Sequence, residues 1–284
     1  MPELDVMTDK SETMPQSIAR EEPIFPEASF LDLTVHAITM EDMHRAIAFS
    51  IEHQQKWLIA NHNLHSVYLA HKQLQQGKTG LANYYRAARW THVDGMSIVA
   101  LASLFGHTIR RSHRIAYNYS LPHLLTLAEQ KGWRVFYLGS SEAVSQDGLH
   151  YLRSRFPSLS VETQHGFFSK EKNSDANQAV LARIAEFKPN ILFVGMGMPI
   201  QEEWITENYD ALSANIILAS GATLDYFVGA LPIPPRWVGR MGLEWAYRLA
   251  NEPLRLGSRY LLEPWSVLLM VLKHALRKLT FSHR

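Results

Sequence analysis

The sequence of 284 residues contains no cysteine. A disulfide framework, a thiolate metal site and a cysteine nucleophile are therefore excluded, and the absence is compatible with a cytoplasmic protein. A strong net charge is also lacking. The 28 Lys and Arg residues oppose 27 Asp and Glu residues, so no global electrostatic field favours nucleic acid as a partner.

Long apolar runs are missing as well, since no segment approaches the roughly 20 apolar residues that span a bilayer. Residues 1–29 are acidic and dotted with proline, without the apolar region of a signal peptide, so we predict a disordered leader. The 14 histidines show no spacing typical of a metal site, and there is no Asp-x-Asp pair. We expect neither a metal ion nor another cofactor.

Short apolar segments alternate with helical patterns beyond the leader. The predicted strands cover residues 56–60, 90–93, 134–138, 159–163, 191–194 and 216–219. Helices are predicted between them, and Thr39 with Asp42 resembles a capping box that opens a helix reaching His53. This order predicts an α/β domain over residues 30–230, with a mostly parallel, Rossmann-like sheet and helices on both faces.

In such sheets, ligands bind beyond the carboxyl ends of the strands. The polar and glycine residues near these ends are Asn61, Asn63, Asp94, Gly139, Gln201, Glu202 and Asp225. Asp94 can act as a general base, or it can cap the next helix. Asn61 and Asn63 occupy alternate positions of an extended segment, so both amides can bind the hydroxyls of one sugar. Alternatively, both residues stabilise a turn of the backbone.

A glycine-containing motif follows the fifth predicted strand. Its sequence is Val194-Gly195-Met196-Gly197-Met198-Pro199-Ile200-Gln201-Glu202-Glu203-Trp204. Gly195 and Gly197 allow a ligand close to the backbone, and the helix start after them favours an anion such as a phosphate. A dinucleotide fingerprint is disfavoured because Ile200 replaces its third glycine. Gln201 and Glu202 either reach a sugar or nucleoside or form a solvated first helical turn.

We predict that residues 231–284 form a basic, amphipathic and helical appendage. Its apolar stripe consists of Leu261, Leu262, Trp265, Leu268, Leu269, Leu272, Leu276 and Leu279. Its basic residues include Arg236, Arg240, Arg248, Arg255, Arg259, Lys273, Arg277 and Lys278. Two interpretations remain open: an interfacial membrane anchor, or helices packed on the domain or on another subunit.

Taken together, these segments resemble the WecG/TagA/CpsF family of bacterial glycosyltransferases over about residues 30–260. The matching positions are Asn63, Val93-Asp94-Gly95, Arg114 and residues 135–139, 165–168, 194–204, 221–229, 234–237 and 242–249, followed by Glu252-Pro253 and Arg255. The resemblance implies transfer of a sugar, with inversion, from a UDP-sugar to a polyprenyl-diphosphate-linked saccharide. It also implies a cytoplasmic protein that is peripheral on the inner face of the cell membrane.

The resemblance assigns roles to individual residues. In the family, the aspartate matching Asp94 is the proposed general base, and the asparagine matching Asn63 lies beside it. With Asn61 added, these form the expected catalytic group. The expected donor-binding residues are Gly139, Gly195, Gly197, Gln201, Glu202 and Asp225. The expected ligands of the diphosphate or the acceptor are Arg114, Arg248, Arg255 and Arg259.

The sequence departs from the family pattern near the expected cleft. Asn61 stands where family members usually carry threonine, and Tyr117 and Tyr119 stand where glycine and aspartate usually follow the arginine. N-acetylmannosamine, its uronic acid and glucose all occur as donor sugars in the family. We favour UDP-glucose in exopolysaccharide assembly, with the other two sugars as alternatives.

Other function classes stay open at this point. A non-catalytic nucleotide- or lipid-binding subunit of a polysaccharide assembly complex would share the fold, but it would not need the Asp94 and Asn63 pair. An NAD-dependent oxidoreductase is disfavoured by the incomplete glycine fingerprint. The expected partners are the donor, the lipid-linked acceptor and a membrane surface, and a homo-oligomer is compatible with the apolar tail.

Overall fold

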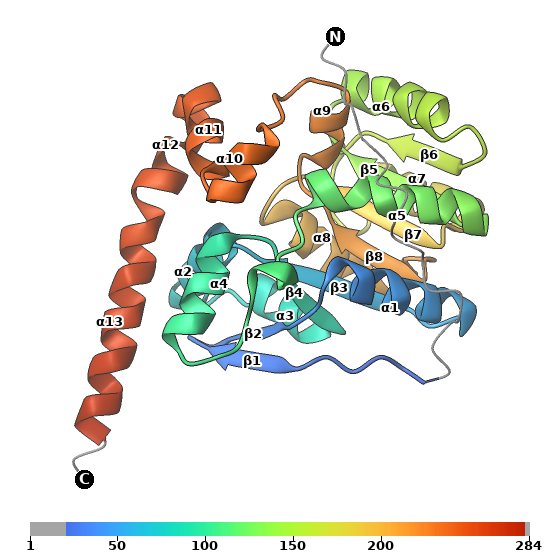
Figure 1. The fold of residues 1–284 in the computed structure, drawn as a ribbon. Helices are drawn as coiled ribbons and strands as arrows, with labels where there is room; N and C mark the ends of the chain where they lie inside the picture. Colours follow the sequence, from blue (N-terminus) through green and yellow to red (C-terminus); the bar gives the residue numbers. More distant parts are fainter. Residues whose placement is uncertain (1–20, 282–284) are drawn as a thin grey trace.

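The computed structural model describes residues 21–281, without the side chains of Arg236, Arg240 and residues 277–281. Its centre is a six-stranded sheet in which all neighbouring strands are parallel, with the order β4-β3-β8-β7-β5-β6 (Figure 1). The strands are β3 (Trp57–His62), β4 (Trp90–Val93), β5 (Arg134–Gly139), β6 (Ser160–Gln164), β7 (Ile191–Gly195) and β8 (Ile216–Ala219). The parallel sheet predicted from the alternating pattern is confirmed.

Helices cover both faces of the sheet. On one face lie α1 (Met40–Glu52), α5 (Tyr117–Lys131), α6 (Glu142–Arg155) and α9 (Thr223–Phe227). On the other face lie α3 (Gly80–Ala87), α7 (Asp175–Phe187) and α8 (Ile200–Asn208). The central strands are buried on both faces, as their continuous apolar runs require. Two short 3₁₀ helices, Arg111–His113 and Tyr209–Ala211, lie in the connections.

Each face of the sheet packs against its helices in one hydrophobic core. A third core, which was not predicted, lies beside the sheet. It joins an antiparallel hairpin, β1 (Glu27–Phe30) and β2 (Leu33–His36), to α2 (Leu64–Gln75) and α4 (Met96–Leu104). Leu31 and Asp32 connect the two strands with positive φ angles, the geometry of a two-residue hairpin turn that usually carries Asn-Gly. The predicted leader is therefore too long, because residues 27–29 belong to β1. Residues 1–20 of that leader lie outside the described residues.

The appendage consists of α10 (Arg236–Met241), α11 (Glu244–Asn251), α12 (Pro253–Leu261) and α13 (Glu263–Phe281). In Figure 1, α13 stands at the side of the molecule, against α2. Its inner side packs through buried Val267. Eight apolar residues of α12, of α13 and of the junction between them are exposed: Leu254, Leu261, Leu262, Trp265, Leu268, Leu269, Leu272 and Leu276. Leu279 lies outside the described side chains. No helix within residues 21–281 is both long and apolar enough to cross a membrane.

The order of the strands marks where a ligand can enter. From β5 the chain proceeds to its neighbour β6, whereas from β7 it proceeds in the opposite direction to β8. Strands β5 and β7 therefore flank a topological switch point, the usual position of a ligand in open α/β sheets. Gly139 and Gly195 pair there at the carboxyl ends of the two strands.

Candidate active site

Asp94 lies directly after β4, at the carboxyl edge of the sheet. Its backbone N–H donates to the carbonyl oxygen of His62 at 3.0 Å, and its Oδ2 accepts from Nδ2 of Asn63 at 3.2 Å. Asn63 is fixed in turn because it caps α2, its Oδ1 accepting from the backbone N–H of Ser66 at 3.1 Å. Helix α4 begins two residues later, at Met96, with Gly95 as its N-cap, so Asp94 does not take the capping position. The carboxylate is thus oriented by an amide and remains half-buried.

Asn61 does not join Asn63 in a clamp. It lies inside β3, is 6% exposed, and donates from Nδ2 to the carbonyl oxygen of Ala219 on β8 at 3.0 Å. The predicted strand ended too early, because β3 continues through His62. The expectation that Asn61 orients the sugar is therefore replaced by a structural role between two strands.

A buried polar pair, His92 and Tyr117, lies near Asp94. The hydroxyl of Tyr117 on α5 lies 3.1 Å from Nε2 of His92 on β4, and both side chains are buried. Burial lowers the pKa of His92 to about 4, although the nearby charge of Asp94 acts against this shift. Burial and the same charge raise the pKa of Tyr117. Both groups are therefore neutral near pH 7 and add no charge beside the carboxylate.

Arg114 connects this edge to the appendage. Its Nε donates to the backbone carbonyl oxygen of Asp94 at 3.0 Å, and its guanidinium forms an ion pair with Glu244 of α11. The two charged side chains are only 11% and 17% exposed. Arg114 was expected to bind a diphosphate, but its contacts make it a bracket between the Asp94 loop and α11. Glu244, which lies in the matching segment 242–249 but was assigned no site role, completes that bracket.

Arg248 lies one helical turn beyond Glu244 and faces the same edge. Its guanidinium lies 5.2 Å from the centre of the Tyr226 ring. Burial opposes its charge, but Tyr226, Tyr260 and Asp94 together raise its pKa, and its buried Nε has no partner among the described residues. Arg248 is thus a cation with an unused donor, placed near the carboxylate.

The other two appendage arginines are placed differently from Arg248. Arg255 of α12 is exposed and donates twice to Glu252, the N-cap residue of the same helix, at 2.6 and 2.7 Å. Arg259 lies over the ring of Tyr260, with 5.6 Å to its centre. Of the predicted appendage arginines, the structure therefore brings Arg248 to the Asp94 edge.

The glycines at the switch point are required by packing and turns. A Cβ atom on Gly139 would lie 2.2 Å from the carbonyl oxygen of Gly195, and one on Gly195 would lie 2.2 Å from the hydroxyl of Tyr137. Gly197 has a φ of +80° with open space around it. We expected both motif glycines to make room for a ligand, but Gly195 makes room for the neighbouring strands and Gly197 allows the turn.

Gln201 and Glu202 point into the protein, 2% and 0% exposed. Oε1 of Gln201 accepts from the backbone N–H groups of Gly197 and Gly221 at 3.1 and 3.2 Å, and its Nε2 donates to Glu202 at 2.7 Å. The burial of both side chains contradicts the solvated turn and leaves no exposed group for the expected sugar contact. The pair instead forms a clasp that joins the loops after β7 and β8. Burial raises the pKa of Glu202 to about 7, and its Oε2 has no partner among the described residues.

Asp225 and Phe167 remain accessible in this half of the site. Asp225 on α9 is half-buried and accepts from the hydroxyl of Ser140 at 2.6 Å. Phe167 follows β6 and is 76% exposed, although a Cβ on its neighbour Gly166 would lie 2.8 Å from Met196. The structure therefore presents an exposed aromatic ring on a closely packed loop. The signal in the sequence was a glycine and two aromatic residues after a strand.

Comparison with known proteins identifies related sequences. The family model described as "Glycosyl transferase WecG/TagA/CpsF family" matches residues 28–280. Two curated proteins, from Staphylococcus aureus strains MRSA252 and MW2, are each 30% identical over 172 residues, which cover 60% of this chain and 64% of the relative. Each carries the name N-acetylglucosaminyldiphosphoundecaprenol N-acetyl-beta-D-mannosaminyltransferase. The match thus spans just under two thirds of the length of these relatives.

Proposed function

Because the chain belongs to the WecG/TagA/CpsF family of glycosyl transferases, we propose that it is an enzyme that transfers a sugar from a UDP-sugar to a polyprenyl-diphosphate-linked saccharide. The observation that carries this proposal is the Asp94 carboxylate, oriented by Asn63 at the carboxyl edge of the sheet and near Arg248. A non-catalytic binding subunit would not require an oriented carboxylate beside an unpaired cationic donor.

In the proposed reaction, Asp94 takes the proton from an acceptor hydroxyl. The hydroxyl oxygen forms a bond to the anomeric carbon, and the bond between that carbon and the β-phosphate oxygen breaks on the opposite face. The sugar is transferred with inversion, UDP leaves with the electron pair of the broken bond, and the proton stays on Asp94. Arg248 balances the charge of the leaving diphosphate through its free Nε.

The donor lies over the switch point between β5 and β7 in this proposal. The carboxylate of Asp225 is positioned to accept hydrogen bonds from ribose hydroxyls, and the exposed ring of Phe167 offers a stacking surface for the base. Gln201 and Glu202 hold the glycine loops in shape without touching the donor.

The relatives change our proposal for the sugar. The names of these relatives specify transfer of N-acetylmannosamine to N-acetylglucosaminyl-diphosphoundecaprenol. We therefore replace UDP-glucose by UDP-N-acetylmannosamine as the proposed donor, with lipid-diphosphate-linked N-acetylglucosamine as the acceptor. The expectation of exopolysaccharide assembly has no support from these relatives.

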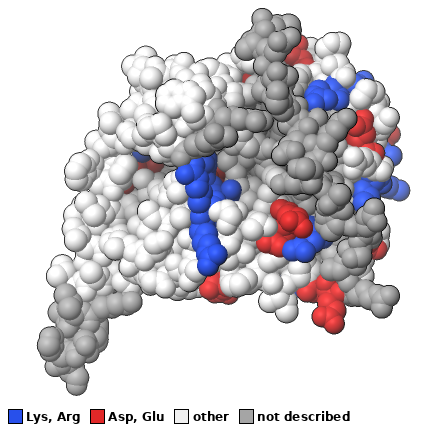
Figure 2. All heavy atoms as spheres, viewed as in Figure 1, with Lys and Arg blue, Asp and Glu red and all other residues white. Residues whose placement is uncertain are grey.

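A lipid-linked acceptor requires the enzyme to work at a membrane surface. The exposed apolar residues of α12 and α13 offer an apolar face that can contact the membrane. In the view of Figure 2, most of the described atoms of the projecting C-terminal helix belong to residues that are neither basic nor acidic. Peripheral attachment to the cytoplasmic face of the cell membrane through the appendage is therefore part of the proposal.

Turnover with a panel of UDP-sugars and a short-chain polyprenyl-diphosphate N-acetylglucosamine tests the proposal directly. We expect UDP release and a disaccharide product with UDP-N-acetylmannosamine. Turnover with UDP-glucose alone would refute the proposed donor but not the transferase. Binding of UDP without turnover of any sugar, by full-length protein on vesicles, would favour the binding subunit instead.

A further inference from the structure

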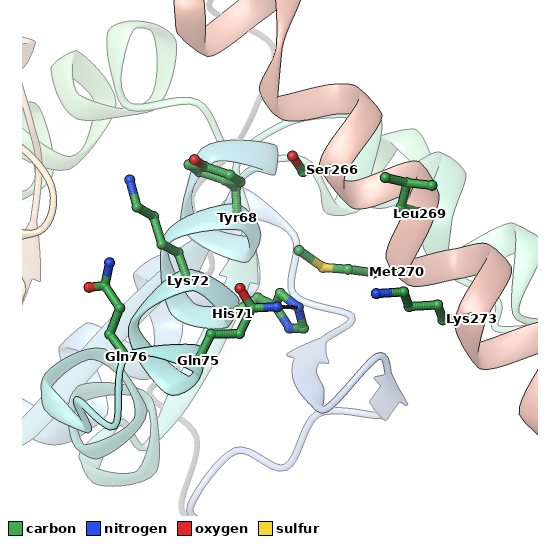
Figure 3. A pocket seen from close by; sticks show the side chains of 9 residues that line it. All are labelled: Tyr68, His71, Lys72, Gln75, Gln76, Ser266, Leu269, Met270 and Lys273. Atoms are coloured by element: carbon green, nitrogen blue, oxygen red, sulfur yellow. Dashed lines mark hydrogen bonds between the residues drawn. The ribbon is translucent and has the colours of Figure 1, made fainter.

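A cavity lies between α2 and α13, apart from the Asp94 site. It has a volume of about 390 Å³ and is lined by Tyr68, His71, Lys72, Gln75, Gln76, Ser266, Leu269, Met270 and Lys273 (Figure 3). Figure 3 shows Lys273 and Met270 extending from α13 toward α2, where His71 and Gln75 face them. The nine residues thus form two walls of a polar cavity of the size that holds small ligands.

The charge of the cavity is positive. Lys72 contributes from α2 and Lys273 from α13, and none of the nine lining residues is acidic. Neither lysine takes part in an ion pair within the part of the chain that the structure describes. Tyr68 and Ser266 add hydroxyl donors and Gln76 adds an amide, whereas Nε2 of Gln75 lies 2.9 Å from Nε2 of His71. An anion with several acceptor oxygens, such as a phosphate group, fits this set of donors.

Contacts on both sides of the cavity hold its walls together. At the start of α13, Glu263 accepts from Nδ1 of His65 at 2.7 Å, and Val267 is buried in the third core. Further along α13, the ring of His274 packs edge-on against Phe105 with 5.3 Å between centroids. The cavity therefore lies between two anchoring points and does not depend on a loose helix end.

The cavity adjoins the exposed apolar face of α13. Leu269 lines the cavity and is 57% exposed, and Trp265, Leu268 and Leu272 continue the apolar face at the surface. A ligand bound here would have its phosphate next to a surface that suits hydrocarbon. A free phosphate ion would leave that surface unused, whereas a membrane lipid would occupy both parts.

We propose that this cavity binds the phosphate of an anionic glycerophospholipid headgroup and so sets how the appendage lies on a membrane. The inference rests on the membrane attachment included in the proposed function. It requires neither donor nor acceptor, because the cavity shares no lining residue with the Asp94 site.

Vesicle sedimentation of the full chain tests this site. Wild-type protein should bind vesicles containing phosphatidylglycerol more tightly than vesicles of phosphatidylcholine alone. Lys72→Ala/Lys273→Ala should weaken binding to the anionic vesicles about 30-fold, the effect of two cationic groups at an anionic surface. The matched control Lys131→Ala/Lys172→Ala removes the same charge from exposed positions outside the cavity and should have a much smaller effect. Equal losses in the two double variants would overturn the proposal.

Filling the cavity separates a headgroup site from general attraction to negative charge. Gln75→Trp and Ser266→Trp keep the net charge and change opposite walls. Either variant should lose the preference for phosphatidylglycerol while keeping its binding to phosphatidylcholine. A preference that persists in both variants, with unchanged melting temperatures, would show that no headgroup enters the cavity.

Competition distinguishes the source of the phosphate. Short-chain phosphatidylglycerol should displace the protein from anionic vesicles at far lower concentration than inorganic phosphate. Equal displacement by the two would contradict a lipid site and indicate a free-phosphate site. Because these assays involve no sugar transfer, loss of the headgroup site leaves the transferase proposal intact. Conversely, a protein inactive toward UDP-sugars could still show binding that depends on the two lysines.

Discussion

The two halves of the candidate site use polar side chains in opposite ways. At the β5–β7 edge, Gln201 and Glu202 turn inward and satisfy the backbone of neighbouring loops, so this half is complete within the α/β domain. At the β3–β4 edge, Asp94 depends on Asn63 from its own domain and, through Arg114, on Glu244 from the appendage. Under the proposed function, donor binding is therefore built into the domain, whereas the proposed base depends on a docked appendage.

The largest expected effect is at the base itself. Asp94→Asn removes the proton acceptor but keeps an oxygen that can accept from Asn63. We expect turnover to fall about 10²–10⁴-fold, because a positioned base supplies that range. UDP affinity by calorimetry should stay unchanged, since the donor half lies at other strands. Asp210→Asn, on a surface 3₁₀ helix, is the control. Near wild-type turnover in D94N would exclude Asp94 as the base.

The raised pKa of Glu202 predicts that the free energy of unfolding depends on pH, by about 3 kcal/mol. Burial raises its pKa from 4.5 to about 7, so the folded protein holds a proton that the unfolded chain releases above pH 4.5. The free energy of unfolding should therefore fall as pH rises from 4.5 to 7, by about 3 kcal/mol from this group, and stay low above pH 7. Glu202→Gln should remove this slope in urea titrations. An identical slope in the variant would mean that Glu202 ionises freely.

Breaking the bracket tests whether the base depends on the appendage. Glu244→Gln leaves Arg114 without its counter-charge, so the Asp94 loop should lose part of its positioning, with turnover falling about 100-fold. Hydrogen exchange of α11 should increase in parallel. Glu252→Gln breaks the ion pair with the exposed Arg255 at the start of α12 and should change turnover little. If E244Q loosens α11 but keeps full turnover, the base does not need the appendage.

The clasp can be separated from a direct sugar contact by measuring stability. Gln201→Ala leaves two N–H groups, of Gly197 and Gly221, without their acceptor. We expect the free energy of unfolding to drop by about 2 kcal/mol, with the loss in UDP affinity following from disordered loops. A variant that is as stable as wild type but has a raised KM for the donor would restore the sugar-contact interpretation.

Sequence reasoning succeeded where local pattern decides the structure. The capping box of Thr39 and Asp42 and the alternation of strands and helices along the chain are present as predicted. It failed where a side chain's direction depends on distant segments: Gln201 turns inward because Gly221, twenty residues away, needs an acceptor. The Arg114–Glu244 pair spans 130 residues, so no spacing rule could find it. The β1–β2 hairpin was missed because its turn lacks the usual glycine.

The smallest expected effect concerns the accessible rim of the donor half. Phe167→Ala removes a ring that is already 76% exposed, so it should leave the melting temperature unchanged. If the ring stacks on the base, UDP affinity should fall about tenfold, within the range for one aromatic–base contact. Phe167→Tyr should restore affinity because it keeps the aromatic face, whereas Phe167→Leu, which keeps the bulk but not the ring, should not. Restoration by leucine would reduce Phe167 to an apolar contact, and an unchanged affinity in F167A would place the base elsewhere on the β5–β7 edge.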